Sequence, residues 1–278
     1  MNEPINIFWF RRDLRLEDNA GLYHALKSGL PVLPVFIFDK NILDRLENNS
    51  DRRVTFIYRQ LKKIHDELLK FNSSLKIIYD NPVSAFEKLL KKYSVKAIYT
   101  NRDYEPYATR RDAEIEILCV KHGVDFITFK DQVIFEKNEI VKDDDTPYTI
   151  FTPYSKKWKL KFSESEIQSF DSKKLFGNFL KETFPFPALS SMGFKKNETF
   201  LPDPHIDKTT ILNYHHHRDF PFPGKTTHVS LHLRFGTISI RKLAMKEGLM
   251  NEKYLNELIW REFLMQVLWH FPHNETNP

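Results

Sequence analysis

The sequence predicts an α/β fold: a doubly wound parallel sheet of five strands, followed by a connector and a helical region. Two observations lead to this prediction. Short apolar runs rich in Ile, Val, Phe and Tyr alternate with helical patterns through the first 130 residues, as strands buried on both faces should. Beyond residue 200, apolar residues recur every three to four positions, which is typical of packed helices.

The strands and three of the helices between them have recognisable limits. Asp51 is a residue type that caps helix N-termini, and an amphipathic pattern follows it. Pro82 and Pro106 each suit the first turn of a helix, and the helix after Pro106 is expected to end at His122 and Gly123. The five strands are expected at residues 5–10, 32–38, 75–80, 96–100 and 124–129.

Three segments of different composition divide the chain. We expect an α/β domain at residues 1–130, a connector at 131–200 and a helical domain at 201–278. The connector is predicted because an acidic run, several prolines and a Ser/Lys-rich stretch replace the regular alternation there. In the last segment, the apolar spacing predicts helical structure around 229–250 and 254–268.

The overall composition predicts a folded protein of the cytoplasm. Apolar residues make up 41% of the chain, which is enough for a packed core. The sequence shows neither a signal peptide nor an apolar stretch of membrane-spanning length, so no membrane partner is expected. A net charge of +5 allows a polyanionic partner without requiring one.

The cysteine and histidine content predicts neither a disulfide nor a metal site. The single cysteine, Cys119, excludes an intramolecular disulfide and a cysteine-based zinc site. Three consecutive histidines occupy residues 215–217. Neighbouring residues of a helix point about 100° apart, so these three side chains do not easily share one ion.

Arginines follow the first strand in place of a glycine-rich nucleotide-binding motif. The sequence there lacks the G-x-G-x-x-G pattern of dinucleotide-binding folds. Arg11, Arg12 and Arg15 lie at the carboxyl end of the strand, where open α/β sheets bind ligands, and they could hold an anion or a neighbouring domain. The alternative is a structural cluster of salt bridges with the acidic residues nearby, Asp13, Glu17 and Asp18.

The stretch PGKTT, residues 223–227, matches only the end of a phosphate-binding P-loop. The first glycine of that motif would fall at Asp219, and no predicted strand precedes it. Thr226, Thr227 and Ser230 nevertheless supply hydroxyl groups just before an apolar helical run, where free backbone N–H groups attract anions. The alternative is an ordinary helix cap.

A charged pair lies within the apolar pattern of the last predicted helix. Its residues share one helical face with two apolar neighbours: Tyr254, Glu257, Leu258 and Arg261, with Trp260 at the edge. An exposed ion pair between Glu257 and Arg261 would contribute about 0.2–0.5 kcal/mol, whereas a buried one is costly without further polar partners. The face is therefore either an amphipathic surface with a solvated salt bridge or one wall of a ligand pocket.

Five stretches of the sequence together resemble the DNA photolyase/cryptochrome family. They occur in the family's order, at plausible spacing, and cover nearly the whole chain. The first and the last, NIFWFRRDLRLEDNAGL and LNELIWREF, are the most specific of them. The five stretches are residues 6–22, 101–112, 151–158, 218–243 and 255–263.

The resemblance implies a light-driven DNA-repair enzyme, a deoxyribodipyrimidine photo-lyase that acts as a monomer. It implies an N-terminal antenna domain, a connector and the first part of an all-α FAD-binding domain. In this family, excited reduced FAD donates an electron to a cyclobutane pyrimidine dimer flipped out of UV-damaged DNA. An antenna chromophore would pass on light energy; it would be of the folate type, such as methenyltetrahydrofolate, or a flavin or deazaflavin.

The family's site residues carry over to matching positions of this sequence. Glu257 and Trp260 are the implied catalytic pair, because Glu257 would hydrogen-bond the damaged bases and Trp260 would stack on them. Together with Arg218 and Arg261, they form the implied DNA-binding set. The implied FAD-binding residues are Tyr214, Thr226, Thr227, His228, Val229, Ser230, Tyr254, Glu257 and Arg261.

Further positions correspond to the family's antenna region, and two positions differ from the residues usual in the family. Asn101 and Glu105 match the antenna region, and Arg53 is a further candidate for it. His228 stands where the family often has Arg, and Tyr254 stands where it often has Trp. Family members continue beyond residue 278 with further helices, so we expect the chain to be truncated and inactive alone. The alternative function is a cryptochrome-type blue-light photoreceptor without repair activity.

Overall fold

The computed structural model describes residues 3–199, 203–220 and 224–275. Two compact units are distinguished by their internal packing, and each has a hydrophobic core of its own. The first unit consists of Met1–Arg102, Arg111–Phe129 and Phe170–Leu201. The second consists of Asp103–Arg110, Lys130–Ser169 and Pro202–Pro278.

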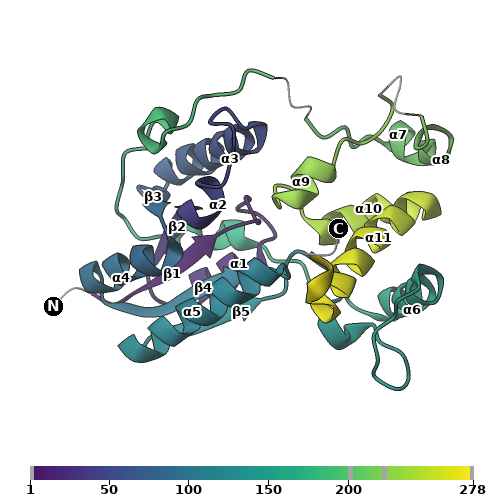
Figure 1. Cartoon of the computed structure of the whole chain (residues 1–278), viewed down its shortest axis with the longest axis horizontal. Helices are drawn as coiled ribbons and strands as arrows, with labels where there is room; N and C mark the ends of the chain where they lie inside the picture. Colours follow the sequence, from purple (N-terminus) through teal and green to yellow (C-terminus); the bar gives the residue numbers. More distant parts are fainter. Residues whose placement is uncertain (1–2, 200–202, 221–223, 276–278) are drawn as a thin grey trace. The chain divides into compact units, whose positions relative to one another are not determined.

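The first unit is built on one sheet of five parallel strands (Figure 1). The strands are β1 Ile5–Phe10, β2 Val32–Asp39, β3 Lys76–Asp80, β4 Val95–Asn101 and β5 Asp125–Phe129. Their order in the sheet is β3-β2-β1-β4-β5. The five predicted strands are therefore confirmed, with ends that differ from the prediction by at most one residue.

The helices around this sheet begin where the sequence predicted. The side chain of Asp51 accepts a hydrogen bond from the backbone N–H of Arg53, and Pro82 occupies the first turn of its helix. Pro106 begins another, and Gly123 after its end has a φ of +64°, the left-handed conformation common there. The elements are α1 Ala20–Lys27, α2 Lys40–Leu43, α3 Arg52–Leu69, α4 Pro82–Lys92, α5 Pro106–His122, η2 Ser172–Asn178 and η3 Leu189–Met192.

Helices cover both faces of the sheet. Ile7 and Trp9 of β1 share a core with residues of α4 and α5. Phe8 lies between them in sequence and so points to the opposite face. There α1 approaches so closely that a Cβ atom on Gly21 would lie 3.0 Å from the Phe8 ring. The sheet is therefore doubly wound, as predicted.

The second unit is helical, and its core lies around the two longest of its helices. Tyr154 and Trp158 of α6 pack in this core with Ile259 and Phe263 of α11. Its elements are η1 Lys137–Glu139, α6 Phe151–Glu164, α7 Lys208–Leu212, α8 Tyr214–His217, α9 Ser230–Arg234, α10 Ile240–Lys246, η4 Gly248–Met250, α11 Glu252–His270 and η5 Pro272–Glu275. Within the described part of the chain, no helix has the length and apolar character needed to span a membrane.

The region 229–250, which the sequence predicted as helical, is divided into two short helices and a 3₁₀ turn. Helix α9 ends at Arg234, and Gly236 follows with a left-handed φ of +63°. Ser239 then caps α10, because its hydroxyl accepts a hydrogen bond from the N–H of Lys242 at 3.2 Å. The apolar spacing therefore indicated helical character but did not reveal the break.

The predicted connector, residues 131–200, is shared between the two units. Its first part carries η1 and α6 and supplies Ile134 and Trp158 to the core of the second unit. Its last part belongs to the first unit, where Leu180 donates its N–H to the carbonyl of Val32 at 2.8 Å. The functional roles given to the three predicted segments stay predictions.

Candidate functional site

Helix α11 carries four of the residues implied in cofactor or DNA binding. Tyr254 is buried in the core of the second unit, Glu257 and Arg261 are partly exposed, and Trp260 is 39% exposed. Asn251 begins the helix by accepting hydrogen bonds from two backbone N–H groups of its first turn. The residues predicted to share one face thus run from the protein core to the surface.

Glu257 forms an ion pair with Arg218, which directly follows α8. Arg218 also lies 3.2 Å from the carboxylate of Asp219. The side chains of Arg218 and Glu257 are 32% and 33% exposed, and an ion pair at such a site contributes only about 0–1 kcal/mol. The ion pair can therefore be broken at low cost when a new partner arrives. The guanidinium could then bind a phosphate, and the carboxylate could accept a hydrogen bond from a base N–H.

Two tyrosines lie beside this pair. The rings of Tyr214 and Tyr254 meet edge to face, with centroids 5.0 Å apart and planes at 76°. Burial raises the pKa of Tyr254 to about 12. Burial also raises the pKa of Tyr214, and the nearby charge of Glu257 adds to this effect. Both phenols are therefore neutral near pH 7 and can donate hydrogen bonds.

The segment from Thr226 to Ser230 leads into α9. Its side chains alternate in burial: Thr227 and Val229 are buried, Thr226 and His228 are partly exposed, and Ser230 is exposed. Val229 occupies the N-cap position and has no side-chain oxygen, so the first N–H groups of α9 need another acceptor. The helix has only five residues, however, so its dipole is weaker than the predicted longer helix would provide.

Arg261 is held by backbone carbonyl groups in this structure. Its guanidinium donates to the carbonyl of Gln132 at 2.7 Å and to that of Leu233 at 3.3 Å. Hydrogen bonds from a charged donor are stronger than neutral ones, so Arg261 ties α11 to two other segments of the second unit. Its implied contacts with FAD and DNA stay predictions.

Glu262 is a buried residue to which the sequence analysis gave no role. Its side chain is almost inaccessible, with 2% of the residue exposed. The carboxylate accepts hydrogen bonds from the N–H groups of Ile134 at 2.7 Å and Phe135 at 2.9 Å, and from the indole of Trp158 at 2.6 Å. Burial raises the pKa of Glu262 to about 7, against the opposing effect of these three donors. The sequence feature that could have revealed this role is a glutamate on the apolar side of a predicted helix.

Residues 131–140, which we call the strap, are bound to α11 along much of its length. Four α11 side chains contact the backbone of the strap: Arg261, Glu262, Gln266 and His270. At one end of the strap, Asp131 forms a buried ion pair with Arg241 of α10 at 2.9 Å. These contacts fix the position of the helix that carries Glu257 and Trp260.

The indole of Trp260 stacks on the ring of Phe151, the first residue of α6. The ring centroids are 3.8 Å apart, and the planes differ by 8°. The resemblance implied that Trp260 stacks on a damaged base. Its side chain is exposed enough for such a contact, which stays a prediction.

Asn101, one of the three antenna candidates, is buried at the end of β4. Its amide donates to the side chains of Asp13 at 2.6 Å and Asn19 at 2.8 Å. Its side-chain oxygen accepts the N–H of Gly21 at 2.8 Å. Both donor hydrogens of the amide are therefore already used to hold the loop between β1 and α1.

The other two antenna candidates are charged and more exposed. Arg53 in the first unit pairs with Asp51 at 2.6 Å, and its side chain is 63% exposed. Glu105 in the second unit pairs with Arg234 at 2.7 Å. Pairs of this kind can rearrange around a ligand at low cost, so the antenna role of both residues stays open as a prediction.

Two of the arginines that follow β1 belong to a structural cluster. Arg11 forms an ion pair with Asp112, and its backbone N–H donates to the carboxylate of Asp13 at 2.6 Å. Arg15 donates to the carbonyl of Asp18 at 2.7 Å. Both arginines therefore have structural contacts, but the ion pair of Arg11 is with Asp112, and these contacts with Asp13 and Asp18 each involve a backbone group.

Neither the cysteine nor the histidine run lies in a reactive arrangement. Cys119 is buried, and burial raises the pKa of its thiol to about 11, so the thiolate does not form near pH 7. Residues 215–217 lie on α8. Over the ranges that the structure describes, no three His, Cys, Asp or Glu side chains are grouped to hold a metal ion.

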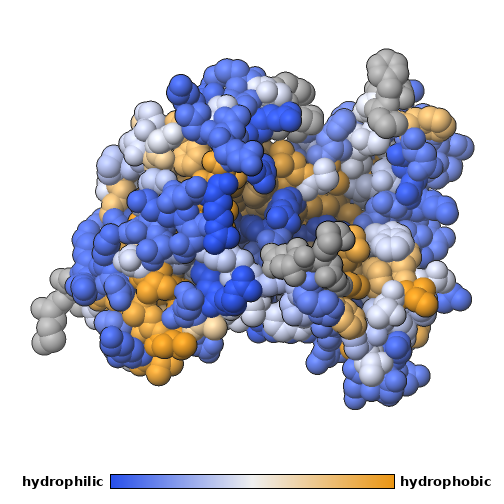
Figure 2. Space-filling model, viewed as in Figure 1, coloured by the Kyte–Doolittle hydropathy of each residue, from blue (hydrophilic) through white to orange (hydrophobic). Residues whose placement is uncertain are grey.

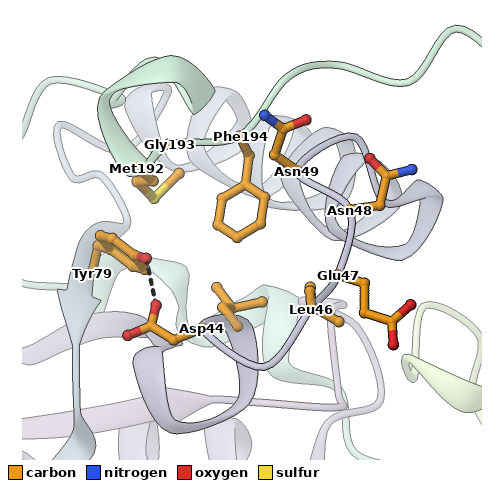
Figure 3. Close-up of a pocket in the computed structure, with 10 residues that line it drawn as sticks. Asp44, Leu46, Glu47, Asn48, Asn49, Tyr79, Met192, Gly193 and Phe194 are labelled. Carbon is orange, nitrogen blue, oxygen red and sulfur yellow. Dashed lines mark hydrogen bonds between the residues drawn. The ribbon is translucent and has the colours of Figure 1, made fainter.

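A pocket that the sequence did not predict opens in the first unit (Figure 3). It has a volume of about 440 Å³ and lies between residues 43–49, Tyr79 at the end of β3 and residues 192–194. The phenol of Tyr79 donates to the carboxylate of Asp44 at 2.9 Å on one side of it. None of the predicted site residues lines it, and no local pattern links its three separate segments in the sequence.

Comparison with known proteins identifies the family. A family model for DNA photolyase matches residues 6–173, which is more than half of the chain. The fold agrees, since an archaeal photolyase from Sulfolobus tokodaii, solved with two FAD molecules, matches with a TM-score of 0.77 at 28% identity. That match covers 98% of this chain and 60% of the archaeal one. The chain therefore belongs to the DNA photolyase family.

Curated relatives include proteins named deoxyribodipyrimidine photo-lyase and a protein named cryptochrome. A deoxyribodipyrimidine photo-lyase of Synechococcus is 26% identical over 306 residues, covering 100% of this chain and 63% of the relative. Cryptochrome-1 of Spalax judaei is 24% identical over 309 residues, covering 98% of this chain and 52% of the relative. The chain thus spans less than two thirds of the length of these relatives.

Proposed function

We propose that the chain forms the antenna domain and the first part of the FAD-binding domain of a deoxyribodipyrimidine photo-lyase. The proposed reaction is the light-driven splitting of cyclobutane pyrimidine dimers in UV-damaged DNA. One observation carries the proposal: Glu257, which forms an exchangeable ion pair with Arg218, lies on the same helix as the exposed indole of Trp260. The similarity to the Synechococcus photo-lyase supports it.

The three side chains match what an extrahelical pyrimidine offers. The guanidinium of Arg218 suits a backbone phosphate, which positions the strand but carries no sequence information. The indole of Trp260 suits the flat face of a base. The carboxylate of Glu257 can accept the N–H at position 3 of a thymine. Together they would hold a damaged base by its phosphate, its ring face and its polar edge.

Several of the residues implied in FAD binding are of types that suit that cofactor. The N–H groups at the start of α9 lack an acceptor from Val229, and the hydroxyls of Thr226 and Ser230 are near them in sequence, which suits phosphate oxygens. The neutral phenols of Tyr214 and Tyr254 can donate hydrogen bonds or pack against a ring. When bound, reduced and excited by light, FAD supplies the electron that opens the cyclobutane ring.

Binding of a damaged oligonucleotide tests the substrate. Fluorescence anisotropy would compare a labelled single strand that contains one thymine dimer with the same strand undamaged. We expect the dimer strand to bind more tightly, and Trp260→Ala to remove about 1–3 kcal/mol of binding free energy. Lys62→Ala, an exposed cation of α3, serves as the control and should leave the preference intact. Equal affinity for the two strands would overturn the proposal.

A cryptochrome-type photoreceptor is the second candidate, because the chain is also similar to Cryptochrome-1 of Spalax judaei. An assay of light-dependent dimer repair distinguishes the two functions. The chain would be loaded with FAD, reduced and illuminated with a dimer-containing strand, and recovery of thymine absorbance near 260 nm would be followed against a dark control. Recovery only in light favours the photo-lyase, whereas retained FAD with equal affinity for the dimer strand and the undamaged strand favours the photoreceptor.

We also propose that an antenna chromophore of the folate or flavin type binds to this protein. The archaeal relative solved with two FAD molecules supports a second chromophore. Arg53 and Glu105 are the stronger of the candidate residues, because the amide hydrogens of Asn101 are already donated within the first unit. Loss of a bound chromophore from the absorption spectrum of Arg53→Ala would support this role. The monomeric state and the cytoplasmic location stay predictions from the sequence.

A further inference from the structure

We infer that Phe151 is a positioning residue for Trp260, which it holds so that one extrahelical pyrimidine stacks on the opposite face of the indole. The inference rests on the proposed function, because it concerns how the same site recognises damaged DNA. The two ring centroids are 3.8 Å apart and the planes differ by 8°. At this separation the rings are in contact face to face, so Phe151 covers one face of Trp260.

A third ring fixes this stack from the side. The ring of Phe263 lies edge-on to both, with centroids 5.6 Å from Trp260 and 5.9 Å from Phe151. Phe263 is buried and also contacts Tyr154 at 5.0 Å within the core of the second unit. Edge-to-face contact is one of the geometries that aromatic pairs prefer, so Phe263 helps to hold the two stacked rings in place. The stack is therefore anchored to the core.

One face of the indole remains open. Trp260 is 39% exposed although Phe151 covers one of its faces and Phe263 lies along an edge. The exposed area therefore belongs mainly to the opposite face and the free edges. A base that stacks there extends the column of parallel rings that Phe151 begins.

This arrangement selects for bases outside a duplex. A base inside a duplex has neighbours on both faces and cannot stack on a protein ring without leaving the helix. Leaving costs least for a damaged, poorly paired step. An indole that is already immobilised loses little rotational freedom when the base arrives, so it binds more tightly than a mobile one. Phe151 therefore contributes to affinity without touching the base.

Two variants of Phe151 in the full chain test the inference. Phe151→Leu removes the ring but keeps an apolar side chain of similar reach, and Phe151→Tyr restores the ring. Ile150→Ala, at an exposed neighbouring residue, is the matched control. The first readout is acrylamide quenching of Trp260 without DNA, taken as the difference from a Trp260→Phe variant. We expect stronger quenching in Phe151→Leu and wild-type quenching in the other two.

The second readout is affinity for the strand with one thymine dimer and for an undamaged duplex. Phe151→Leu should weaken binding of the dimer strand about fivefold to tenfold, leave duplex binding unchanged, and be rescued in Phe151→Tyr. If Phe151→Leu does not fold by circular dichroism, Phe151→Met takes its place. A dimer preference in the wild type that survives unchanged in Phe151→Leu overturns this inference alone. Absence of any preference in the wild type overturns the proposed function, and the inference with it.

Discussion

At the scale of single residues, two glutamates of α11 differ in what surrounds them. Glu262 is buried and accepts three hydrogen bonds from two segments, the strap and α6, whereas Glu257 forms a partly exposed ion pair. A buried charged group that loses its partners costs about 3–5 kcal/mol, whereas an exposed pair contributes about 0–1 kcal/mol. Substitution of these residues, five positions apart on one helix, should therefore separate stability from binding.

The pH dependence of stability tests the burial of Glu262. Its pKa is about 7 in the folded protein against 4.5 as its ordinary value, so the folded state retains a proton that the unfolded state has lost. This group's contribution to the free energy of unfolding should fall as pH rises from about 4.5 to about 7, by on the order of 3 kcal/mol. Glu262→Gln should be less stable throughout but lack this slope.

Urea unfolding followed through Trp158 fluorescence measures that free energy, since Trp158 donates directly to Glu262. The difference between wild type and Glu262→Gln isolates the one carboxyl group from others that titrate in the same range. An identical pH slope in both proteins would show that the carboxyl group is not perturbed by burial.

The salt dependence of DNA binding tests Arg218. If its guanidinium leaves Glu257 for a phosphate, Arg218→Ala should reduce the slope of log affinity against log salt concentration by about 1. Glu257→Gln should leave that slope unchanged and weaken binding of the dimer strand only. Lys62→Ala is the control for a general loss of charge. An unchanged slope in Arg218→Ala would rule out its contact with phosphate.

At the scale of elements, α5 has two apolar sides of unequal burial. Ile115 lies in the core of the first unit, whereas Ile117 and Val120 are 71% and 75% exposed, and apolar surface is visible over this helix in Figure 2. Exposed apolar patches promote self-association. The amphipathic pattern of α5 is therefore incomplete, and its outer side can be changed without loss of packing.

Charge on the outer side of α5 should improve solubility. Ile117→Glu places a carboxylate four residues before Lys121, a spacing that contributes about 0.2–0.5 kcal/mol to a helix. We expect the free energy of unfolding to change by no more than about 0.5 kcal/mol and aggregation on heating, followed by light scattering, to decrease. Ile115→Glu is the matched control and should unfold the first unit. Strong destabilisation by Ile117→Glu would mean that this side is covered.

At the scale of the whole molecule, two units with separate cores can be perturbed one at a time. Trp9 lies in the core of the first unit and Trp158 in that of the second. In variants that keep only one of these tryptophans, Glu262→Ala should lower the unfolding midpoint reported by Trp158 and leave that reported by Trp9 unchanged. Equal shifts of both midpoints in urea would show that the units unfold as one cooperative block.

Local patterns predicted much of the fold. The five strands, the cap at Asp51 and the helix starts at Pro82 and Pro106 were confirmed because each depends on residues close together in sequence. The break at Gly236 was missed, because apolar spacing continues across it while a single left-handed residue ends the helix. Family membership was also confirmed, since its motifs are contiguous stretches.

The sequence by itself determined which residues could bind, and only the tertiary structure decided what each one contacts. Phe151 and Trp260 are 109 positions apart, and Glu262 bonds to residues more than 100 positions away. No periodicity relates such positions, because they meet only when α6, the strap and α11 pack together. In the first unit, the packing of β4 against the loop after β1 turned Asn101 inward, and in the second unit the packing of α11 left Trp260 39% exposed. Chemical type is a local property of a chain, whereas the choice of partner follows from the packing of distant segments.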